Sequence, residues 1–215
     1  MKNRKTNFIM LMLSSVLCFT ACNNADGLLS VKIGNQEWAS ENLNVSTFRN
    51  GDAIPEAQTR EAWVKAGEEG KPAWCYYDND PENGNKYGRL YNWYAVTDPR
   101  GLAPSGWHIP SDEEWTTLAD NLGGDDDAAG KKMKSKAGWH DNGNGSNTSG
   151  FSGLPGGYRN YDGTFYVIGF NGNWWSSTEY NTYYAWYRYL HYSNGIVYRF
   201  NNYKSNGFSV RCLRD

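Results

Sequence analysis

The pattern of hydrophobic and polar residues has a period of two in the last third of the chain, which predicts β-strands. Asn194-Gly195 separates two of these segments, and this dipeptide favours a tight hairpin. Alternation along the strands places Trp186, Tyr198 and Phe200 on one face of the predicted sheet, together with Arg188. The predicted strands cover residues 174–178, 185–192, 196–201 and 208–213.

A helical period is found in the middle of the chain. After Ser111 the apolar residues recur at i, i+3, i+4 and i+7, and Glu114 stands where it would complete a capping box. This helix should end at Gly123-Gly124, because glycine commonly follows a helix C-terminus. Two shorter helices are predicted over residues 60–66 and 126–134.

The remaining segments indicate a hairpin and loops. Residues 28–43 alternate around Gly34-Asn35, which predicts a hairpin. Residues 78–86 and 141–157 are rich in turn formers and predict loops. Residues 90–96 are apolar and fit a strand or a helix, since periodicity does not decide between them. The expected fold is α+β, with antiparallel sheets, two or three short helices and long loops.

The N-terminal segment predicts export. A basic start precedes an apolar run over residues 8–20, which is shorter than the roughly 20 residues that a membrane-spanning helix needs. Residues 19–22, Phe-Thr-Ala-Cys, resemble a bacterial lipobox, which implies that Cys22 becomes lipidated; an ordinary secretory signal is the alternative. We expect a signal peptide over 1–21, a tether over 22–27 and one domain over 28–215. The expected location is the cell envelope, as an outer-membrane lipoprotein facing the periplasm or the cell surface.

Composition narrows the classes of protein that fit. The chain of 215 residues contains 10 Trp, 16 Tyr and 8 Phe, and only 20% of its residues are charged. Such a chain favours a folded domain rich in strands over a disordered one. The net charge of −2 argues against a protein that binds nucleic acid by neutralising phosphates.

Few residues suggest a disulfide, a metal site or catalysis. Outside the N-terminal segment only Cys75 and Cys212 remain as cysteines, and in an oxidising compartment we expect them to form a disulfide. Asp78 and Asp80 suggest a calcium loop, but Asn83 stands where an EF-hand needs glycine, so a solvated turn without a cofactor is favoured. The histidines and the carboxylates after Ser111 lack catalytic or metal-binding spacing, so no catalytic or metal residue is predicted.

The aromatic residues provide the binding signal. Consecutive strand residues face opposite sides of a sheet, so part of the aromatic run must be exposed. Flat rings suit the apolar faces of sugars, whereas the alternative is that the rings only fill the core. The candidate ligand-binding residues are Trp174, Trp175, Tyr183 and Tyr184.

Several motifs together carry a family resemblance. They are VKIGNQEW at 31–38, YGRLYNWY at 87–94, GWHIPSDEEW at 106–115, FSGLPGGYR at 151–159, WWSSTE at 174–179 and GFSVRCLRD at 207–215. In this order they closely resemble the Fibrobacter succinogenes major paralogous domain family, which is found on exported bacterial proteins, often lipoproteins.

The same layout is distantly similar to the formylglycine-generating-enzyme (sulfatase-modifying factor) group. This similarity implies a C-type-lectin-like fold. That group holds copper with a cysteine pair on its last strands, but here only Cys212 lies in the corresponding region, so no catalytic residue carries over.

The leading hypothesis is a lipid-anchored binding or adhesion domain of the cell envelope, with a glycan or an envelope protein as its ligand. An envelope enzyme on a sulfatase-modifying-factor-like fold and a structural surface subunit are the alternatives. The lipid anchor would make the membrane one partner, and nucleic acid is not expected as another.

Overall fold

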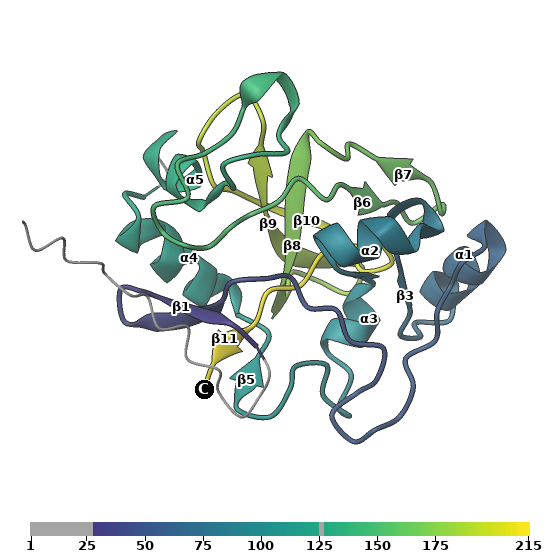
Figure 1. Ribbon diagram of the computed structural model, residues 1–215. Coiled ribbons are helices and arrows are strands. Elements are labelled where there is room, and N and C mark those ends of the chain that lie inside the picture. Colours follow the sequence, from purple (N-terminus) through teal and green to yellow (C-terminus); the bar gives the residue numbers. More distant parts are fainter. Residues whose placement is uncertain (1–27, 125–126) are drawn as a thin grey trace, which may run out of the picture.

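The computed structural model describes residues 28–124 and 127–215. This part of the chain folds into small antiparallel sheets, short helices and long connections, which confirms the predicted α+β class (Figure 1). Its five α-helices exceed the two or three expected from the sequence. Within these residues no helix is both long and apolar enough to cross a membrane.

All five α-helices lie between β2 and β6 in the chain. The strands are β1 (Ser30–Ile33), β2 (Gln36–Ala39), β3 (Trp74–Cys75), β4 (Leu90–Tyr91), β5 (Trp107–His108), β6 (Tyr158–Arg159), β7 (Phe165–Tyr166), β8 (Asn171–Glu179), β9 (Tyr184–His191), β10 (Tyr198–Tyr203) and β11 (Leu213–Arg214). The helices are α1 (Arg60–Glu68), α2 (Pro81–Tyr87), α3 (Trp93–Val96), α4 (Asp112–Asn121) and α5 (Asp127–Met133), with 3-10 turns η1 (Tyr77–Asn79) and η2 (His140–Asn142).

One sheet joins the beginning and the end of the described chain. Its strand order is β1-β2-β11-β5, and β2 pairs with both β1 and β11. The hairpin predicted over residues 28–43 is confirmed, and its turn contains Gly34, whose φ of 60° favours glycine. Leu213 in β11 lies opposite Trp38 on one side and His108 on the other, so three distant parts of the sequence meet in this sheet.

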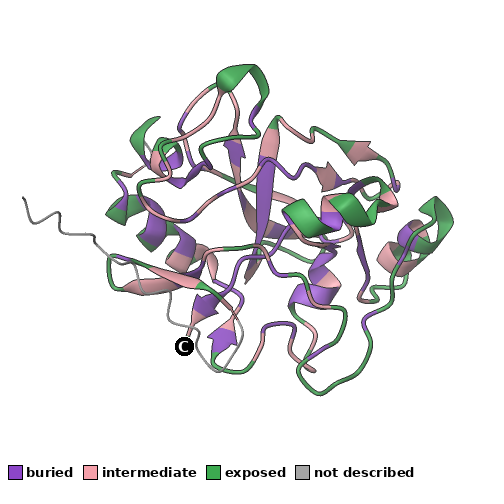
Figure 2. Cartoon of the chain, in the orientation of Figure 1, coloured by how far each residue is buried: buried purple, intermediate pink, exposed green. Residues whose placement is uncertain are grey.

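A second sheet, with the order β10-β9-β8, forms the centre of the molecule, and we call it the central sheet. In Figure 1 it lies between α4 and α5 on one side and α2 and α3 on the other. The consecutive residues Trp174 and Trp175 of β8 enter different hydrophobic clusters, one with Trp115 of α4 and the other with Phe208. Both sides of β8 are therefore covered, as the buried colour of its ribbon in Figure 2 shows.

Capping side chains determine where the helices begin. The Ser111 hydroxyl accepts a hydrogen bond from the backbone N of Glu114, and the Glu114 carboxylate accepts one from the backbone N of Ser111. The predicted capping box is therefore confirmed. Helix α1 begins after its cap Thr59 and continues beyond the predicted range to Glu68. Helix α5 lies within the predicted range 126–134, of which residue 126 is outside the described part.

Helix α2 (Pro81–Tyr87) occupies most of residues 78–86, where a loop was predicted. The Asp80 carboxylate accepts a hydrogen bond from the backbone N of Glu82, and Pro81 occupies the first helical position, where its missing N–H costs nothing. Asp80 and Pro81, which suggested a turn, are thus the N-cap and the first residue of a helix. In residues 90–96 both alternatives occur, since β4 is followed by α3 with Asn92 as the cap between them.

The segment predicted as the last strand differs from the expectation. Phe208 forms a bridge with Tyr91 and Ser209 with Trp174, but a regular strand is found only at Leu213–Arg214. The backbone of this buried segment bonds first to the central sheet and then to the chain after β2. It thereby connects the two sheets, because buried backbone groups must find partners in each.

The dipeptide Asn194-Gly195 does not form a two-residue hairpin. The connection is longer, and β10 begins at Tyr198. The backbone of Gly195 forms two hydrogen bonds with helix α5. The Gly195 O accepts one from the Gly130 N at 2.7 Å, and the Gly195 N donates one to the Asp127 carboxylate. Tertiary contacts therefore outweigh the local turn preference here.

The expected disulfide between Cys75 and Cys212 is wrong, because both cysteines are free. Each thiol is buried in a different hydrophobic cluster, Cys75 with Trp63 and Leu90 and Cys212 with Trp107. Burial raises the pKa of both thiols to about 12. The two cysteines are therefore unreactive core residues in this structure.

Candidate functional site

The register of the central sheet corrects the predicted alternation. Tyr198 lies opposite Tyr189, and Phe200 lies opposite Tyr187. Directly opposed residues of an antiparallel pair point to the same side, so Tyr198 and Phe200 lie on the face opposite Trp186. A two-residue turn at Asn194-Gly195 would pair Tyr198 with His191, which also lies on the face opposite Trp186. The predicted face was therefore wrong for either turn, because the alternation of each strand was not paired across the turn.

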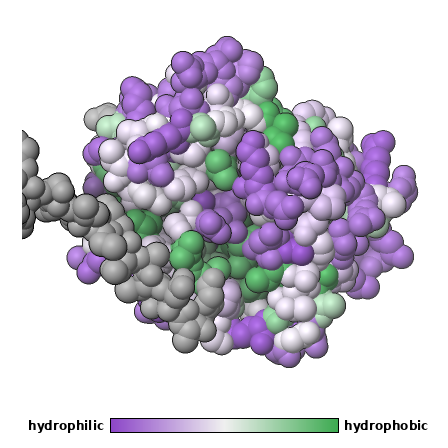
Figure 3. Space-filling view, in the orientation of Figure 1, coloured by the Kyte–Doolittle hydropathy of each residue, from purple (hydrophilic) through white to green (hydrophobic). Residues whose placement is uncertain are grey.

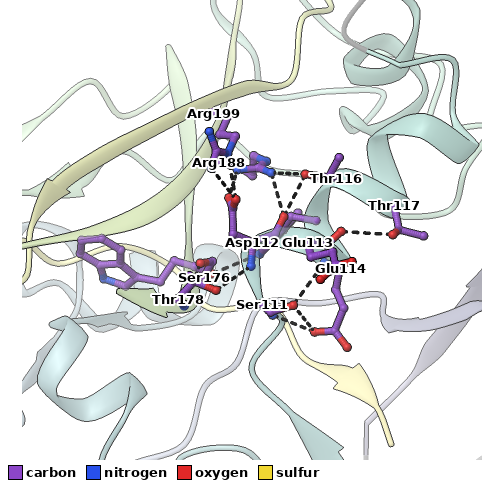
Figure 4. A network of polar contacts seen from close by, with 12 residues as sticks. Ser111, Asp112, Glu113, Glu114, Thr116, Thr117, Ser176, Thr178, Arg188 and Arg199 are labelled. Atoms are coloured by element: carbon purple, nitrogen blue, oxygen red, sulfur yellow. Dashed lines mark hydrogen bonds and ion pairs between the residues drawn. The ribbon is translucent and has the colours of Figure 1, made fainter. Parts of the chain in front are cut away.

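The face that carries Trp186 and Arg188 is covered by α4, and we call it the closed face. Arg188 is buried and donates to the Asp112 carboxylate, to the Asp112 backbone O at 2.9 Å and to the Thr116 hydroxyl at 2.8 Å (Figure 4). Arg199 of β10 donates to the same carboxylate at 2.8 Å. Asp112 in the first turn of α4 therefore holds the helix against the sheet, and its charge is used within the fold.

The other face, which we call the open face, forms a groove. It has a volume of about 300 Å³ and runs over all three strands of the central sheet. We call it the tyrosine groove. It is lined by Tyr158, Val167, Asn171, Asn173, Tyr187, Tyr189, Phe200, Asn202 and Phe208.

Aromatic rings follow one another along the tyrosine groove. The ring centroids of Tyr189 and Tyr198 lie 4.4 Å apart with nearly parallel planes, and those of Tyr187 and Tyr189 lie 6.0 Å apart. The row continues from Tyr187 to Phe208 at 4.6 Å and from Phe208 to Tyr158 at 5.5 Å. Because each ring packs against the next, the row forms a pre-ordered platform.

Amide and hydroxyl groups are the polar groups of the groove. Asn171 and Asn173 come from β8, and Asn202 comes from β10 and hydrogen-bonds to Tyr187. Burial raises the pKa of Tyr187 to about 12, so its hydroxyl is neutral in ordinary conditions and can both donate and accept. Among the residues that the structure describes, none of those lining the groove is charged.

The rim of the groove contains a strained residue. Val167 has a φ of 58°, a left-handed conformation that a β-branched residue rarely adopts. Its backbone O accepts hydrogen bonds from the backbone N of Phe170 and of Asn171, both at 3.0 Å. These bonds hold the turn that leads into β8 and place Val167, which is 37% exposed, beside the rings. Strain of this kind is concentrated at functional sites.

The structure does not bring the four predicted binding residues together. Trp174 and Trp175 are 1% and 0% exposed, so their assignment to a binding surface is wrong. Trp174 points to the closed face beneath α4, whereas Trp175 lies on the open face but is covered by Phe208 and Tyr187. Both belong to the core, which was the alternative considered for these residues.

Tyr183 and Tyr184 lie at another hollow of the surface. Tyr183 is 70% exposed and lines a pocket of about 410 Å³ between α1 and the end of β10. Tyr184 is half-buried, and its ring centroid lies 4.6 Å from that of Tyr203, which also lines this pocket. The prediction that aromatic side chains remain exposed is therefore confirmed for Tyr183.

Of the two acidic residues that suggested a calcium loop, Asp80 is engaged within the chain. Asp80 caps α2, and Asp78 has a φ of 53° within η1. In the described ranges no group of three or more His, Cys, Asp or Glu side chains is placed to hold a metal ion. His108 lies between two carboxylates, with its Nδ1 2.7 Å from Asp215 and its Nε2 3.0 Å from Glu114.

A third hollow, of about 310 Å³, lies beside the buried Arg211. The Arg211 guanidinium donates to the Asn42 side-chain O at 2.8 Å, to the Ala39 backbone O at 3.0 Å and to the Phe151 backbone O at 2.5 Å. Its donors thus join the end of the N-terminal hairpin to the long loop, and we assign Arg211 a structural role.

The surface seen in Figure 3 is mainly hydrophilic, and its hydrophobic residues are gathered in several separate areas.

Residues 31–214 match the family model described as the Fibrobacter succinogenes major domain. The chain belongs to this family. The resemblance stated from the motifs is thereby confirmed, whereas the wider similarity to the C-type-lectin-like group stays a prediction. No curated protein matches the chain. No solved structure matches it either.

In this Fibrobacter succinogenes major domain the groove residues carry a signal that the sequence analysis did not use. Two aromatic residues alternate with Arg188 in β9, at Tyr187 and Tyr189, and two alternate with Arg199 in β10. Pairing the two arginines with each other gives the register that the structure has. The asparagines of β8 and β10 could then have been assigned to the same face.

Proposed function

We propose that this protein is a binding domain for neutral glycans, held at the cell envelope by a lipid on Cys22, and that the tyrosine groove is its ligand site. The observation that carries the proposal is an open row of tyrosine and phenylalanine rings flanked by asparagine amides in a groove without charged side chains.

The chemistry of the groove matches a neutral sugar. One side of a pyranose ring presents C–H groups, which pack on aromatic faces, while its hydroxyls both donate and accept hydrogen bonds. Asn171, Asn202 and the Tyr187 hydroxyl offer both kinds of partner at the groove. A charged ligand would find no opposite charge there. We therefore favour an uncharged glycan over a peptide or an acidic polymer.

The glycan proposal can be tested by screening the protein on glycan arrays and cell-wall fragments, followed by titration of the best ligand. Phe200→Ala is the first variant, because Phe200 is 52% exposed and its removal should leave the fold intact. We expect about a tenfold loss of affinity, as one stacking ring and its area contribute about 1–1.5 kcal/mol. The matched control is Tyr180→Ala, since Tyr180 is 50% exposed and lies outside the groove. Equal losses in both variants, or no binding to any neutral glycan, would overturn the proposal.

The C-type-lectin-like architecture is also part of the proposal. It is supported by the small antiparallel sheets, the short helices and the long loops of the domain. Comparison of an experimental structure with C-type-lectin-like domains tests it, and a different strand connectivity would contradict it.

The anchor is supported by the lipobox resemblance at residues 19–22, which lie outside the described residues. Two or more acyl chains suffice for stable membrane anchoring. We expect the native protein to fractionate with membranes and to incorporate labelled palmitate, and Cys22→Ala to abolish the labelling. Unchanged labelling of the variant would exclude lipidation at this position.

A further inference from the structure

The pocket that contains Tyr183 is separate from the tyrosine groove and differs from it in charge. Four tyrosines from different parts of the chain line it, and we call it the tyrosine cage. Its volume is about 410 Å³. The cage tyrosines are Tyr94, Tyr161, Tyr183 and Tyr203.

Two close backbone approaches shape the cage. At Gly67 of α1 an added Cβ would lie 2.7 Å from the Ser205 Cβ, so the helix can approach the end of β10 only with glycine at this position. Gly163, with a φ of +86°, lies against Arg60 at the start of the same helix, where an added Cβ would be 2.7 Å from the Arg60 Cγ. Helix α1 therefore forms a fixed wall of the cage.

The rings of the cage are exposed and differ in orientation. Tyr161, Tyr183 and Tyr203 are 49%, 70% and 40% exposed, which is unusual for three neighbouring large side chains. The ring centroids of Tyr161 and Tyr203 lie 5.0 Å apart at an interplanar angle of 60°. This edge-to-face contact holds the two rings against each other in the lining of the cage.

The charges at the cage favour a cation. Glu68 and Asp162 supply two carboxylates against the single guanidinium of Arg60, whose Nε donates to the Asp162 backbone O at 2.8 Å. The Asp162 carboxylate accepts hydrogen bonds from the Thr164 backbone N at 2.9 Å and its hydroxyl at 2.6 Å. These bonds hold the pKa of Asp162 below its usual value, so the carboxylate remains ionised.

From this geometry we propose that the tyrosine cage binds an organic cation of the quaternary ammonium class, such as a choline headgroup. The negative faces of aromatic rings attract a cation without requiring it to donate hydrogen bonds. The trimethylammonium group has no N–H, so a cage of rings with an acidic wall suits it better than it suits a protonated amine. The proposal stands independently of the glycan site, because no cage tyrosine lines the tyrosine groove.

The test uses the full-length protein in detergent and three small probes, measured by calorimetry and by saturation-transfer NMR. Choline is the expected ligand, 3,3-dimethyl-1-butanol is its uncharged isostere, and ethanolamine is the primary-amine analogue. We expect choline to bind, the isostere to show no binding, and ethanolamine to bind more weakly than choline.

Variants connect the binding to the cage. Tyr183→Ala and Tyr203→Ala should each weaken choline binding about fivefold, the value of one exposed cation–π contact. Glu68→Gln should weaken it less, and the exposed Tyr180→Ala, outside the cage, should leave it unchanged. Near-UV circular dichroism verifies that Tyr183→Ala, which removes the most exposed ring, remains folded.

Three outcomes would overturn the binding of a cation in the tyrosine cage. They are absence of choline binding, equal binding of choline and its uncharged isostere, and choline binding that both tyrosine variants leave intact. Ethanolamine binding as tightly as choline would overturn the assignment to quaternary ammonium ions. Loss of choline binding with intact glycan binding, or the reverse, shows which of the two sites has failed.

Discussion

The two faces of the central sheet use alternating residues of the same strands for different purposes. On the closed face Arg188 and Arg199 both form ion pairs with Asp112 of α4, and Arg188 is buried there (Figure 4). On the open face Tyr187 and Tyr189, the immediate neighbours of Arg188, line a groove that also contains asparagines, of which Asn173 lies opposite Tyr189. The charged side chains of the closed face thus stabilise the fold, whereas the neutral rings and amides of the open face lie at the surface. This division is why the exposed tyrosines, and not the charges, indicate function.

The largest effect is expected from Arg188→Ala on the closed face. Arg188 is 3% exposed, and its removal leaves the Asp112 carboxylate partly buried without its main cation. Breaking such a pair costs about 3–5 kcal/mol of unfolding free energy. Urea unfolding followed by tryptophan fluorescence measures this value. A loss below about 1 kcal/mol would mean that the closed face does not hold α4.

Alkaline pH should destabilise the open face through Tyr187. The pKa of Tyr187 is about 12 in the folded protein and about 10 in an unfolded chain, because burial disfavours the phenolate. Because the pKa of Tyr187 is higher in the folded than in the unfolded state, its neutral hydroxyl contributes fully to the free energy of unfolding below pH 10. This contribution is lost as the pH rises to 12. When the pH is raised from 9 to 12, we therefore expect the free energy of unfolding of Tyr187→Phe to fall by about 2 kcal/mol less than that of the wild type. Denaturant unfolding at both pH values measures the difference, and identical losses would contradict it.

A pair of substitutions separates stability from binding. Phe200→Ala on the open face should change the unfolding free energy by less than about 0.5 kcal/mol but should lower the affinity for the glycan. Trp186→Ala on the closed face should instead lower stability and leave glycan binding unchanged. The Arg199 guanidinium carbon lies 3.5 Å from the centroid of the Trp186 ring, and the ring centroids of Trp186 and Tyr180 lie 4.9 Å apart. We expect about 1–2 kcal/mol of destabilisation and unchanged affinity. Weaker glycan binding in Trp186→Ala would show that the two faces are not independent.

Local signals predicted the parts of the fold that depend on neighbouring residues. The capping box at Ser111, the helix after Thr59 and the first hairpin follow from hydrogen bonds within a few residues, and all three are found. The family assignment likewise followed from motifs in a fixed order. Turn formers were ambiguous, since Asp80 and Pro81 suit a loop and a helix start equally well.

Long-range packing decided the rest. Trp174 and Trp175 were proposed as ligand contacts because one of two neighbours on a strand usually faces solvent, but β8 is covered on both sides. The groove was missed because the alternation of β9 was not paired with that of β10. Pairing Arg188 with Arg199 places Tyr198 and Phe200 on the face of Tyr187 and Tyr189.

The smallest effect on the closed face is expected from Arg199→Ala, the exposed counterpart of Arg188. The Arg199 side chain is 47% exposed, and its ion pair with Asp112 competes with water and salt. We expect a loss of at most about 1 kcal/mol, which should shrink further at high salt, whereas the cost of Arg188→Ala should hardly change with salt. Unfolding of both variants at low and at high ionic strength measures the contrast. Equal salt dependence in the two variants would show that burial does not distinguish the two arginines. The charged groups of the closed face would then act as a surface network, and the contrast with the open face would rest on its aromatic residues alone.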